Sequence, residues 1–248
     1  MSVRAIRSSK LVKRGMRTSV LAALALALSV PSGYADSIWS IEVELGAVLT
    51  SGNTEEENLK FRTDSSRETD RFKQTIHGDT LRSSQAAATS AQRMYVHYKA
   101  DYKFDDDRSL FARISYEDDR FSGFDYQPDL TAGYSRKLLG TDVHSLAADI
   151  GLGFRRSEAE SGMREDEMIV RLEARYSWQV SDNAKFQQLL SLEAGNAATI
   201  SRSETSLQTS AAGNLAMKLS LNVKNNSDVP VGREKTDTAT SVTLVYSF

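Results

Sequence analysis

Cysteine is absent from all 248 residues, so the chain can form neither a disulfide framework nor a thiolate metal site. Proline is scarce, and Pro128 and Pro230 fall in expected loops, where no ladder hydrogen bond is lost. The longest apolar run, Ser19–Val30, is well short of the roughly 20 residues that a transmembrane helix needs. The sequence also lacks a glycine-rich phosphate loop and zinc-ligand spacing, so we expect no cofactor and no metal.

The first 35 residues have the pattern of a targeting segment. Basic residues precede the apolar run, and Gly33 and Ala35 supply the small side chains of a cleavage site before Asp36. The sequence therefore predicts a signal peptide over residues 1–35 and a mature domain over residues 36–248, with a retained anchor as the alternative. Without the six basic residues of this segment, 25 Lys and Arg stand against 33 Asp and Glu. The resulting net charge of −8 argues against nucleic acid as a partner.

Residues 36–248 alternate between apolar and polar side chains with the period of a β-strand. In Gln92–Phe104, apolar and aromatic residues at even positions oppose charged or polar ones at odd positions, and a helix would scatter these charges over both faces. Such segments predict an all-β fold of about 12 strands. Loops are expected at 83–91, 120–128, 157–166, 195–202 and 226–235, and a weaker hairpin is expected to join Ser206–Leu215 to Lys218–Asn225 through Ala216 and Met217.

The last strand suggests how the sheet ends. Val242, Leu244, Tyr246 and Phe248 share one face, and the chain stops on an aromatic residue. An open sheet would leave this apolar edge available for unwanted pairing, whereas a closed barrel removes the edge. The stretch resembles the C-terminal signature of bacterial outer-membrane proteins, so Tyr246 and Phe248 are the candidate assembly signal. That resemblance implies two kinds of partner during biogenesis, the barrel assembly machinery and periplasmic chaperones.

Periodicity alone does not separate a membrane barrel from a soluble exported β-sandwich. The signal peptide, the terminal Phe248, and the short connections expected after strands two, four, six, eight and ten all favour the barrel. Aromatic residues near the strand ends also fit the interfacial girdles of such a barrel. The predicted fold is therefore a transmembrane antiparallel up-and-down β-barrel in the bacterial outer membrane, with lipids around it.

The chain also resembles a known bacterial family. The matching features are Gly46 with Thr50–Thr54, the tyrosine-rich Tyr95–Phe104, the run Tyr116–Phe121, and Pro230–Phe248. They are similar to a domain-of-unknown-function family whose members are labelled salt-induced outer membrane proteins. The resemblance covers residues 38–248 and implies a twelve-stranded outer-membrane barrel of undefined activity.

The face opposite the apolar one is rich in both acids and bases, which would point into a barrel. The candidate lumen-lining residues are Glu42, Glu44, Arg62, Arg93, Lys99, Asp101, Arg113, Glu117, Arg171, Glu173 and Arg175. A barrel of twelve strands lies between those that side chains fill and those that leave a channel. Two interpretations stay open: the charges line a narrow pore for small ions or solutes, or they close the interior as a salt-bridged plug with an envelope-structural role.

An enzyme is the competing class. A hydrolase needs a nucleophile with a histidine base. Only His77, His97 and His144 are available, and the first two are expected inside the barrel at mid-strand. The acidic runs 55–57 and 105–107 are read as solvated turns rather than calcium sites, because 105–107 lacks the alternating ligands and glycine of a calcium loop. No catalytic residue is assigned, and the predicted protein is not an enzyme.

Overall fold

The computed structural model describes residues 38–51, 57–85, 88–119 and 122–248. The predicted signal peptide, residues 1–35, lies outside the described residues. The described part of the chain contains no apolar helix of the length that a bilayer crossing requires.

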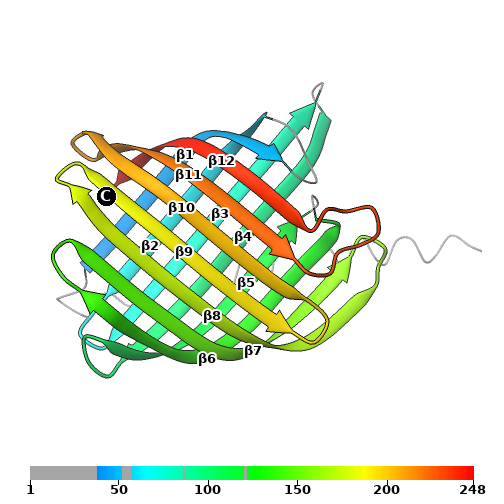
Figure 1. The fold of residues 1–248 in the computed structure, drawn as a ribbon, viewed down its shortest axis with the longest axis horizontal. Coiled ribbons are helices and arrows are strands. Elements are labelled where there is room, and N and C mark those ends of the chain that lie inside the picture. The colour runs from blue at the N-terminus through cyan, green and yellow to red at the C-terminus, as the bar shows by residue number, and fades with distance from the viewer. Residues whose placement is uncertain (1–37, 52–56, 86–87, 120–121) are drawn as a thin grey trace, which may run out of the picture. The chain divides into compact units, whose positions relative to one another are not determined.

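Within the described residues the chain forms an antiparallel barrel whose strands run obliquely around it (Figure 1). The barrel closes between β1 and β12, where Val43 pairs with Tyr246 and Leu45 with Leu244. The prediction of a closed all-β barrel with about 12 strands is confirmed. The strands are β1 (Ile38–Ser51), β2 (Glu57–Glu68), β3 (Phe72–Gln85), β4 (Ala88–Lys103), β5 (Arg108–Asp119), β6 (Phe124–Gly140), β7 (His144–Ala159), β8 (Arg164–Ser181), β9 (Ala184–Gly195), β10 (Thr199–Ala212), β11 (Leu215–Asn226) and β12 (Thr236–Ser247).

The two ends of the barrel differ in their connections. One end, here called the turn end, carries the β2–β3, β4–β5, β6–β7, β8–β9 and β10–β11 connections together with Ile38 and Phe248. The other, the loop end, carries the remaining connections, of which the longest joins Asn226 to Thr236. The short turns expected after the even-numbered strands are found at the turn end.

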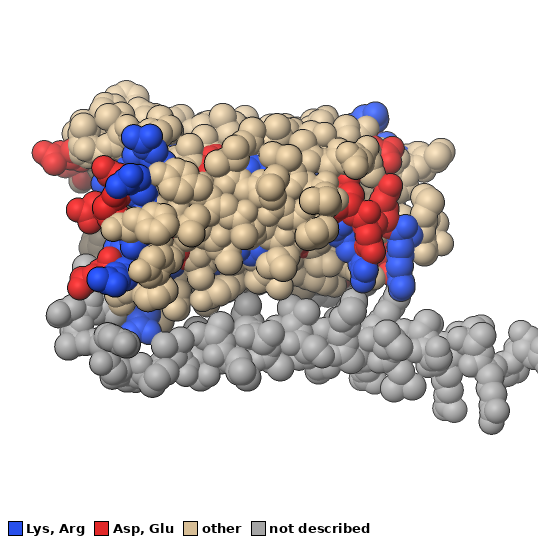
Figure 2. Space-filling model, turned by 90° about the horizontal axis from the view of Figure 1, so that it is seen from below, with Lys and Arg blue, Asp and Glu red and all other residues tan. Residues whose placement is uncertain are grey.

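Apolar side chains cover the outer face of the barrel. Leu45, Ile114, Leu152 and Leu244, for example, are each more than half exposed. Figure 2 shows the result: Lys, Arg, Asp and Glu gather at the two ends, and a band nearly free of charge lies between them. Because successive side chains of a strand alternate between its faces, the polar residues face inward. A soluble sandwich has the reverse arrangement, so that alternative is wrong.

Several expected loops are strand instead. β3 and β4 continue through most of 83–91, β6 begins at Phe124 within 120–128, and β7 and β8 take up most of 157–166. The alternation of apolar and polar residues is weak in these parts of the sequence, so periodicity does not mark them as strands. These extensions also shorten the connections at the loop end, so the contrast with the turn end is smaller than expected.

The predicted position of the turn between β10 and β11 is wrong. The chain turns at Gly213 and Asn214 rather than at Ala216 and Met217, and β10 already begins at Thr199 within the expected loop 195–202. Gly213 has φ +54°, a left-handed conformation that glycine adopts at no steric cost. A Gly-Asn pair between two strands is a recognised hairpin signal, and it marks the true turn.

Glycine is required at position 133 of β6, which pairs with Gly151 of β7. A Cβ atom on Gly133 would lie 2.1 Å from the carbonyl oxygen of Ile150 and 2.5 Å from the Cα atom of Gly151. Since these are backbone atoms, the strands would have to separate to accommodate it.

We expect Gly133→Ala to lower the free energy of unfolding by about 1–3 kcal/mol, the usual cost of overpacking. Urea unfolding in detergent, followed by tryptophan fluorescence, measures the change. Gly78→Ala is the matched control, because its Cβ would meet nothing closer than 3.6 Å. Equal stability of the two variants would contradict the steric argument.

Candidate functional site

The interior of the barrel encloses a cavity of about 900 Å³. Its lining starts at the turn end with Asp105–Asp107 and reaches Thr50 and Asp237 near the loop end. Most of the residues between these ends are charged or hydroxyl-bearing. The barrel therefore contains a polar cavity that extends along much of its length.

The candidate lumen-lining residues lie on the inward face of their strands. Ten of them line the cavity: Glu42, Arg62, Arg93, Lys99, Asp101, Arg113, Glu117, Arg171, Glu173 and Arg175. Glu44 does not, because its side chain is only 1% exposed and packs against Lys218.

A first group of ion pairs joins strands around the β1–β12 seam. Lys218 Nζ of β11 lies 2.8 Å from Glu44 Oε1 and 3.4 Å from Glu204 Oε1. Arg62 Nη1 of β2 lies 2.6 Å from Glu204 Oε1 of β10, and its Nε donates to Asp64 at 2.7 Å. In the sheet order β2 and β10 are separated by three strands, so Arg62 and Glu204 meet inside the lumen rather than along a strand pair.

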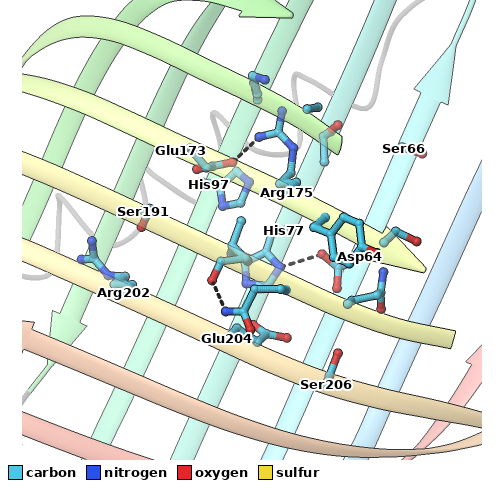
Figure 3. Close-up of a pocket in the computed structure, with 18 of the residues that line it drawn as sticks. Asp64, Ser66, His77, His97, Glu173, Arg175, Ser191, Arg202, Glu204 and Ser206 are labelled. Atoms are coloured by element: carbon cyan, nitrogen blue, oxygen red, sulfur yellow. Dashed lines mark hydrogen bonds and ion pairs between the residues drawn. The ribbon is translucent and has the colours of Figure 1, made fainter. Parts of the chain in front are cut away.

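Three rings form a cluster in the cavity wall. His77 and His97, paired across β3 and β4, stack with ring centroids 5.0 Å apart, and Tyr95 lies within 5.8 Å of both rings. His77 Nδ1 lies 2.6 Å from Asp64 Oδ1, whereas no hydrogen-bond partner for His97 Nδ1 is found among the described residues. Figure 3 shows His77 pointing toward Asp64, with Glu204 nearby. The expectation that these two histidines lie inside at mid-strand is met.

A second group of ion pairs follows strands β4 to β9. Lys99 Nζ lies 2.7 Å from Asp149 Oδ2 and 3.1 Å from Asp101 Oδ1. Both oxygens of Asp149 also accept from Arg175 at 2.8 Å, and Arg175 continues to Glu173, as Figure 3 shows. Opposite charges thus alternate along this wall.

Next to the β9–β10 turn, charged residues that do not line the cavity form a compact cluster. Arg155 Nη2 lies 2.6 Å from Glu167 Oε1, and its Nη1 lies 3.4 Å from Glu193 Oε2. Arg155 also donates to the carbonyl oxygen of Ala198 at 2.7 Å, and Glu167 accepts from the Ala197 amide at 2.9 Å. The cluster fastens the β9–β10 turn to the barrel wall.

Near the loop end, ion pairs cross the lumen from one side to the other. Lys224 Nζ of β11 lies 2.9 Å from Glu117 Oε1 and 2.8 Å from Asp119 Oδ2, both of β5. Arg202 Nη2 of β10 lies 2.8 Å from Glu117 Oε2. β5 and β11 stand six places apart in a closed order of twelve strands, which is directly opposite. We call Glu117, Asp119, Arg202 and Lys224 the transverse bridge.

Three connections at the loop end, β5–β6, β7–β8 and β11–β12, also contact one another. Arg233 of the β11–β12 loop lies 3.1 Å from Glu160 of the β7–β8 turn. A Cβ atom added to Gly123 would lie 3.2 Å from both Pro230 and Arg233, so this loop also contacts the β5–β6 connection. The loop end is therefore narrowed twice, by the transverse bridge and by the loop above it.

Several charged residues of these groups were not among the candidates. Arg202 falls in the segment 195–202, which the sequence predicts as a loop, and Glu204 follows this segment directly. Lys218 and Lys224 fall in the hairpin whose turn the sequence predicts at the wrong position. The alternation of Lys218, Ser220, Asn222 and Lys224 with apolar neighbours would have indicated their inward face.

His77 and His144 contact groups other than a serine hydroxyl. His77 Nε2 faces Asp79 at 3.6 Å, so both ring nitrogens of His77 are directed at carboxylates rather than at a serine. His144 stacks on Tyr176 and Trp178 at the turn end, and its Nδ1 is 2.9 Å from the Tyr176 hydroxyl oxygen. Among the described residues, no group of three or more His, Asp or Glu side chains is arranged to hold a metal ion.

Comparisons with known proteins agree with this architecture. The model of a family described as "Protein of unknown function, DUF481" matches residues 43–248. "Uncharacterized protein YdiY" of Escherichia coli (strain K12) is 29% identical over 203 residues, which cover 82% of this chain and 80% of that one.

Among solved structures, a NanC porin superposes with a TM-score of 0.57 at 11% identity, covering 82% of this chain and 98% of the porin. A KdgM porin, solved in complex with disordered oligogalacturonate, gives a TM-score of 0.48 at 16% identity and covers 84% of this chain and 99% of its own. At 11% identity the likeness to the NanC porin is one of fold alone, that of a closed antiparallel β-barrel.

Proposed function

We propose, from the premise that the chain belongs to the DUF481 family of proteins of unknown function, that it is a narrow, non-enzymatic channel of the bacterial outer membrane. The observation that carries this proposal is the polar cavity of about 900 Å³ inside a closed barrel. Water and small charged solutes are stable in such a cavity, because its lining offers hydrogen-bonding groups of both charges. The mixture of charges favours small ions or solutes over one large ligand of a single sign.

The surface of the barrel supports a location in the outer membrane. An apolar band between two charged ends suits hydrocarbon between two headgroup layers, and closure of the barrel leaves the sheet without an open edge. We propose that residues 1–35 direct export and that the turn end faces the periplasm, as short turns do in such barrels. Lipids of the outer membrane are then the constant partners.

Planar-bilayer recording of the refolded mature domain, residues 36–248, tests the channel. Heat-modifiable gel mobility first establishes that the barrel is folded. Discrete conductance steps that scale with salt concentration are the expected result. A folded, inserted barrel that conducts no ions and admits no small solute would leave only the envelope-structural role.

Arg175 is the best single position for testing selectivity. Its side chain is 38% exposed to the cavity, and it balances Glu173 and Asp149. We expect Arg175→Gln to raise the permeability ratio of cations over anions several-fold, because the lumen loses one positive charge while both carboxylates remain. The reversal potential in a salt gradient reports this ratio.

Arg71→Gln is the matched control for that experiment, because Arg71 is exposed in the β2–β3 turn and is not part of the cavity lining. An unchanged reversal potential for Arg175→Gln would show that ions pass elsewhere. Arg171 belongs to the same chain of ion pairs, because it pairs with Glu173 and Glu193. We expect Arg171→Gln to shift the permeability ratio in the same direction.

Tyr246 and Phe248 remain the proposed assembly signal. Both rings are on the outer face at the turn end and pack edge to face with centroids 4.8 Å apart, while the Phe248 amide donates to Ile41 at 2.9 Å. Exposed rings at the end of the last strand are accessible to the barrel assembly machinery and to periplasmic chaperones before the seam closes.

We expect Phe248→Ala to reduce the amount of folded barrel in the outer membrane several-fold, with the chain accumulating in the periplasm. Cell fractionation followed by heat-modifiable mobility measures both pools. Leu244→Ala, which truncates an apolar residue of the same face in mid-strand, is the control. If both variants reduce the amount of folded barrel equally, the cause would be the loss of an apolar contact with lipid rather than the loss of an assembly signal.

A further inference from the structure

The rim of the turn end carries two arginines side by side. Arg108 of β5 and Arg136 of β6 are direct partners in the strand register, and the next pair toward the apolar band is Leu110 with Tyr134. Strand alternation places all four on the outer face, since Ser109 and Ser135 between them are buried inside. Like charges directly opposite on one face destabilise a sheet unless an anion lies between them.

A pocket of about 320 Å³ lies at this pair. It is lined by Asp105, Asp107, Arg108, Tyr134 and Arg136, and we call it the rim pocket. Arg108 Nε donates to Asp105 Oδ2 at 2.7 Å, and Asp107 Oδ1 lies 3.8 Å from Lys137 Nζ. Arg136 forms no ion pair with any residue that the structure describes. One guanidinium of the pocket is therefore left without a partner, and a weakly paired carboxylate stands nearby.

Backbone hydrogen bonds fix the walls of the rim pocket. The Phe104 amide donates to the Arg108 carbonyl at 2.9 Å, and the Lys137 amide donates to the Asp107 carbonyl at 2.7 Å. The Asp107 amide donates to Asp105 Oδ1 at 3.0 Å, which holds the turn between β4 and β5. The two arginines are thus presented by two strands and a closed turn.

The surface between the rim pocket and the apolar band suits an acyl chain. Tyr102 and Phe104, on the neighbouring strand β4 and its turn, are exposed and pack edge to face, as expected at the level of lipid headgroups. Past Leu110 and Tyr134, three alanines stand in register across β4, β5 and β6: Ala100, Ala112 and Ala132. Their side chains end at Cβ and therefore project less far from the sheet than those of Leu110 and Tyr134.

We propose that the rim pocket binds the headgroup of a zwitterionic glycerophospholipid that carries a primary ammonium. The phosphate lies between Arg136 and Arg108, because a guanidinium can donate two parallel hydrogen bonds to phosphate oxygens. The ammonium reaches the Asp107 carboxylate, and the acyl chains pass Leu110 toward the alanines. The inference rests on the membrane location in the proposed function, but not on conduction.

The charges of the rim pocket select among lipids. The two arginines and two aspartates that line the rim pocket have no net charge together. A headgroup with one negative and one positive charge therefore finds an oppositely charged side chain for each. Phosphatidylglycerol is anionic and carries hydroxyl groups where phosphatidylethanolamine carries an ammonium, so Asp107 would have no positive charge opposite it. A phosphatidylcholine presents an ammonium without N–H groups, which cannot donate to Asp107.

Native mass spectrometry of the folded barrel in detergent, titrated with each lipid, tests the proposal. We expect phosphatidylethanolamine to be retained in preference to phosphatidylglycerol and phosphatidylcholine. Arg136→Gln should weaken phosphatidylethanolamine retention about tenfold, as expected for losing hydrogen bonds to a charged group, and Arg136→Lys should weaken it less. Asp107→Asn should remove the preference over phosphatidylglycerol. Arg71→Gln, at the same end but outside the rim pocket, should change nothing.

Equal retention of phosphatidylethanolamine and phosphatidylglycerol by the unchanged barrel would overturn the proposal, as would full retention by Arg136→Gln. Since Arg108 and Arg136 also border the cavity mouth, an Arg136→Gln variant that alters conductance but not lipid retention would assign them to solute entry instead. The titration needs no current through the barrel. A silent barrel with the expected lipid preference would contradict only the channel, and a conducting barrel without it would contradict only the rim pocket.

Discussion

Replacing Glu117 and Lys224 together by serine is expected to raise the single-channel conductance several-fold. The two residues supply one acid and one base of the transverse bridge, so their joint removal leaves the net charge of the lumen unchanged. Serine keeps the position polar but ends far short of the opposite wall, which opens a water-filled gap between β5 and β11. Arg202 retains Glu193 at 3.1 Å, so no base of the bridge is left unpaired.

The control is a serine pair at Arg155 and Glu167, which removes an ion pair between neighbouring strands at residues that do not line the cavity. Planar-bilayer recordings of both variants at one salt concentration give the comparison. Conductance that does not rise in the bridge variant, or that rises equally in both, would show that the transverse bridge is not the narrowest point.

Arg155→Met is expected to lower the free energy of unfolding by about 3–5 kcal/mol, the usual cost of removing one partner from a buried ion pair. Arg155 is only 3% exposed, and its loss leaves Glu167 and Glu193 with one cation fewer. The Ala198 carbonyl also loses its donor. Urea unfolding in detergent, followed through the two tryptophans, Trp39 and Trp178, measures the change.

The adjacent Arg156 provides the control, since it faces outward and pairs with Asp166 while both side chains are more than half exposed. Arg156→Met should cost less than about 1 kcal/mol. Adding Glu167→Gln to Arg155→Met should restore part of the lost stability, because one of the uncompensated charges is gone. A double variant as unstable as Arg155→Met would mean that packing rather than charge accounts for the loss.

Local alternation allowed most of the fold to be predicted from the sequence. Within the apolar band each strand has one apolar and one polar face, and Arg93–Phe104 shows this contrast at nearly every position. It disappears in Thr199–Ala212, where serine and threonine occupy both faces, and that is where the hairpin was misplaced. Tertiary pairing of β10 with β9 and β11 defines the strand there.

The ion pairs could not be predicted in the same way. Alternation places Glu117 inside the barrel, but its partners Arg202 and Lys224 follow from the register of six other strands and from closure of the barrel. Each is more than 80 residues away along the chain. The sequence therefore predicted an inward charge at position 117, but not that the charge would reach the opposite wall.

The seam between β1 and β12 has a consequence for the order in which the chain folds. Lys60 donates to Ser241 and Thr243 donates to Glu44, contacts that join positions 181 and 199 residues apart. Because the chain must close long loops before these contacts form, it loses conformational entropy before the contacts contribute to stability. Folding is therefore slow. A nascent barrel without β12 would lack two partners of the charged side chains on β1 and β2, and its edges would stay open. The charged interior is therefore complete only once β12 has joined the sheet.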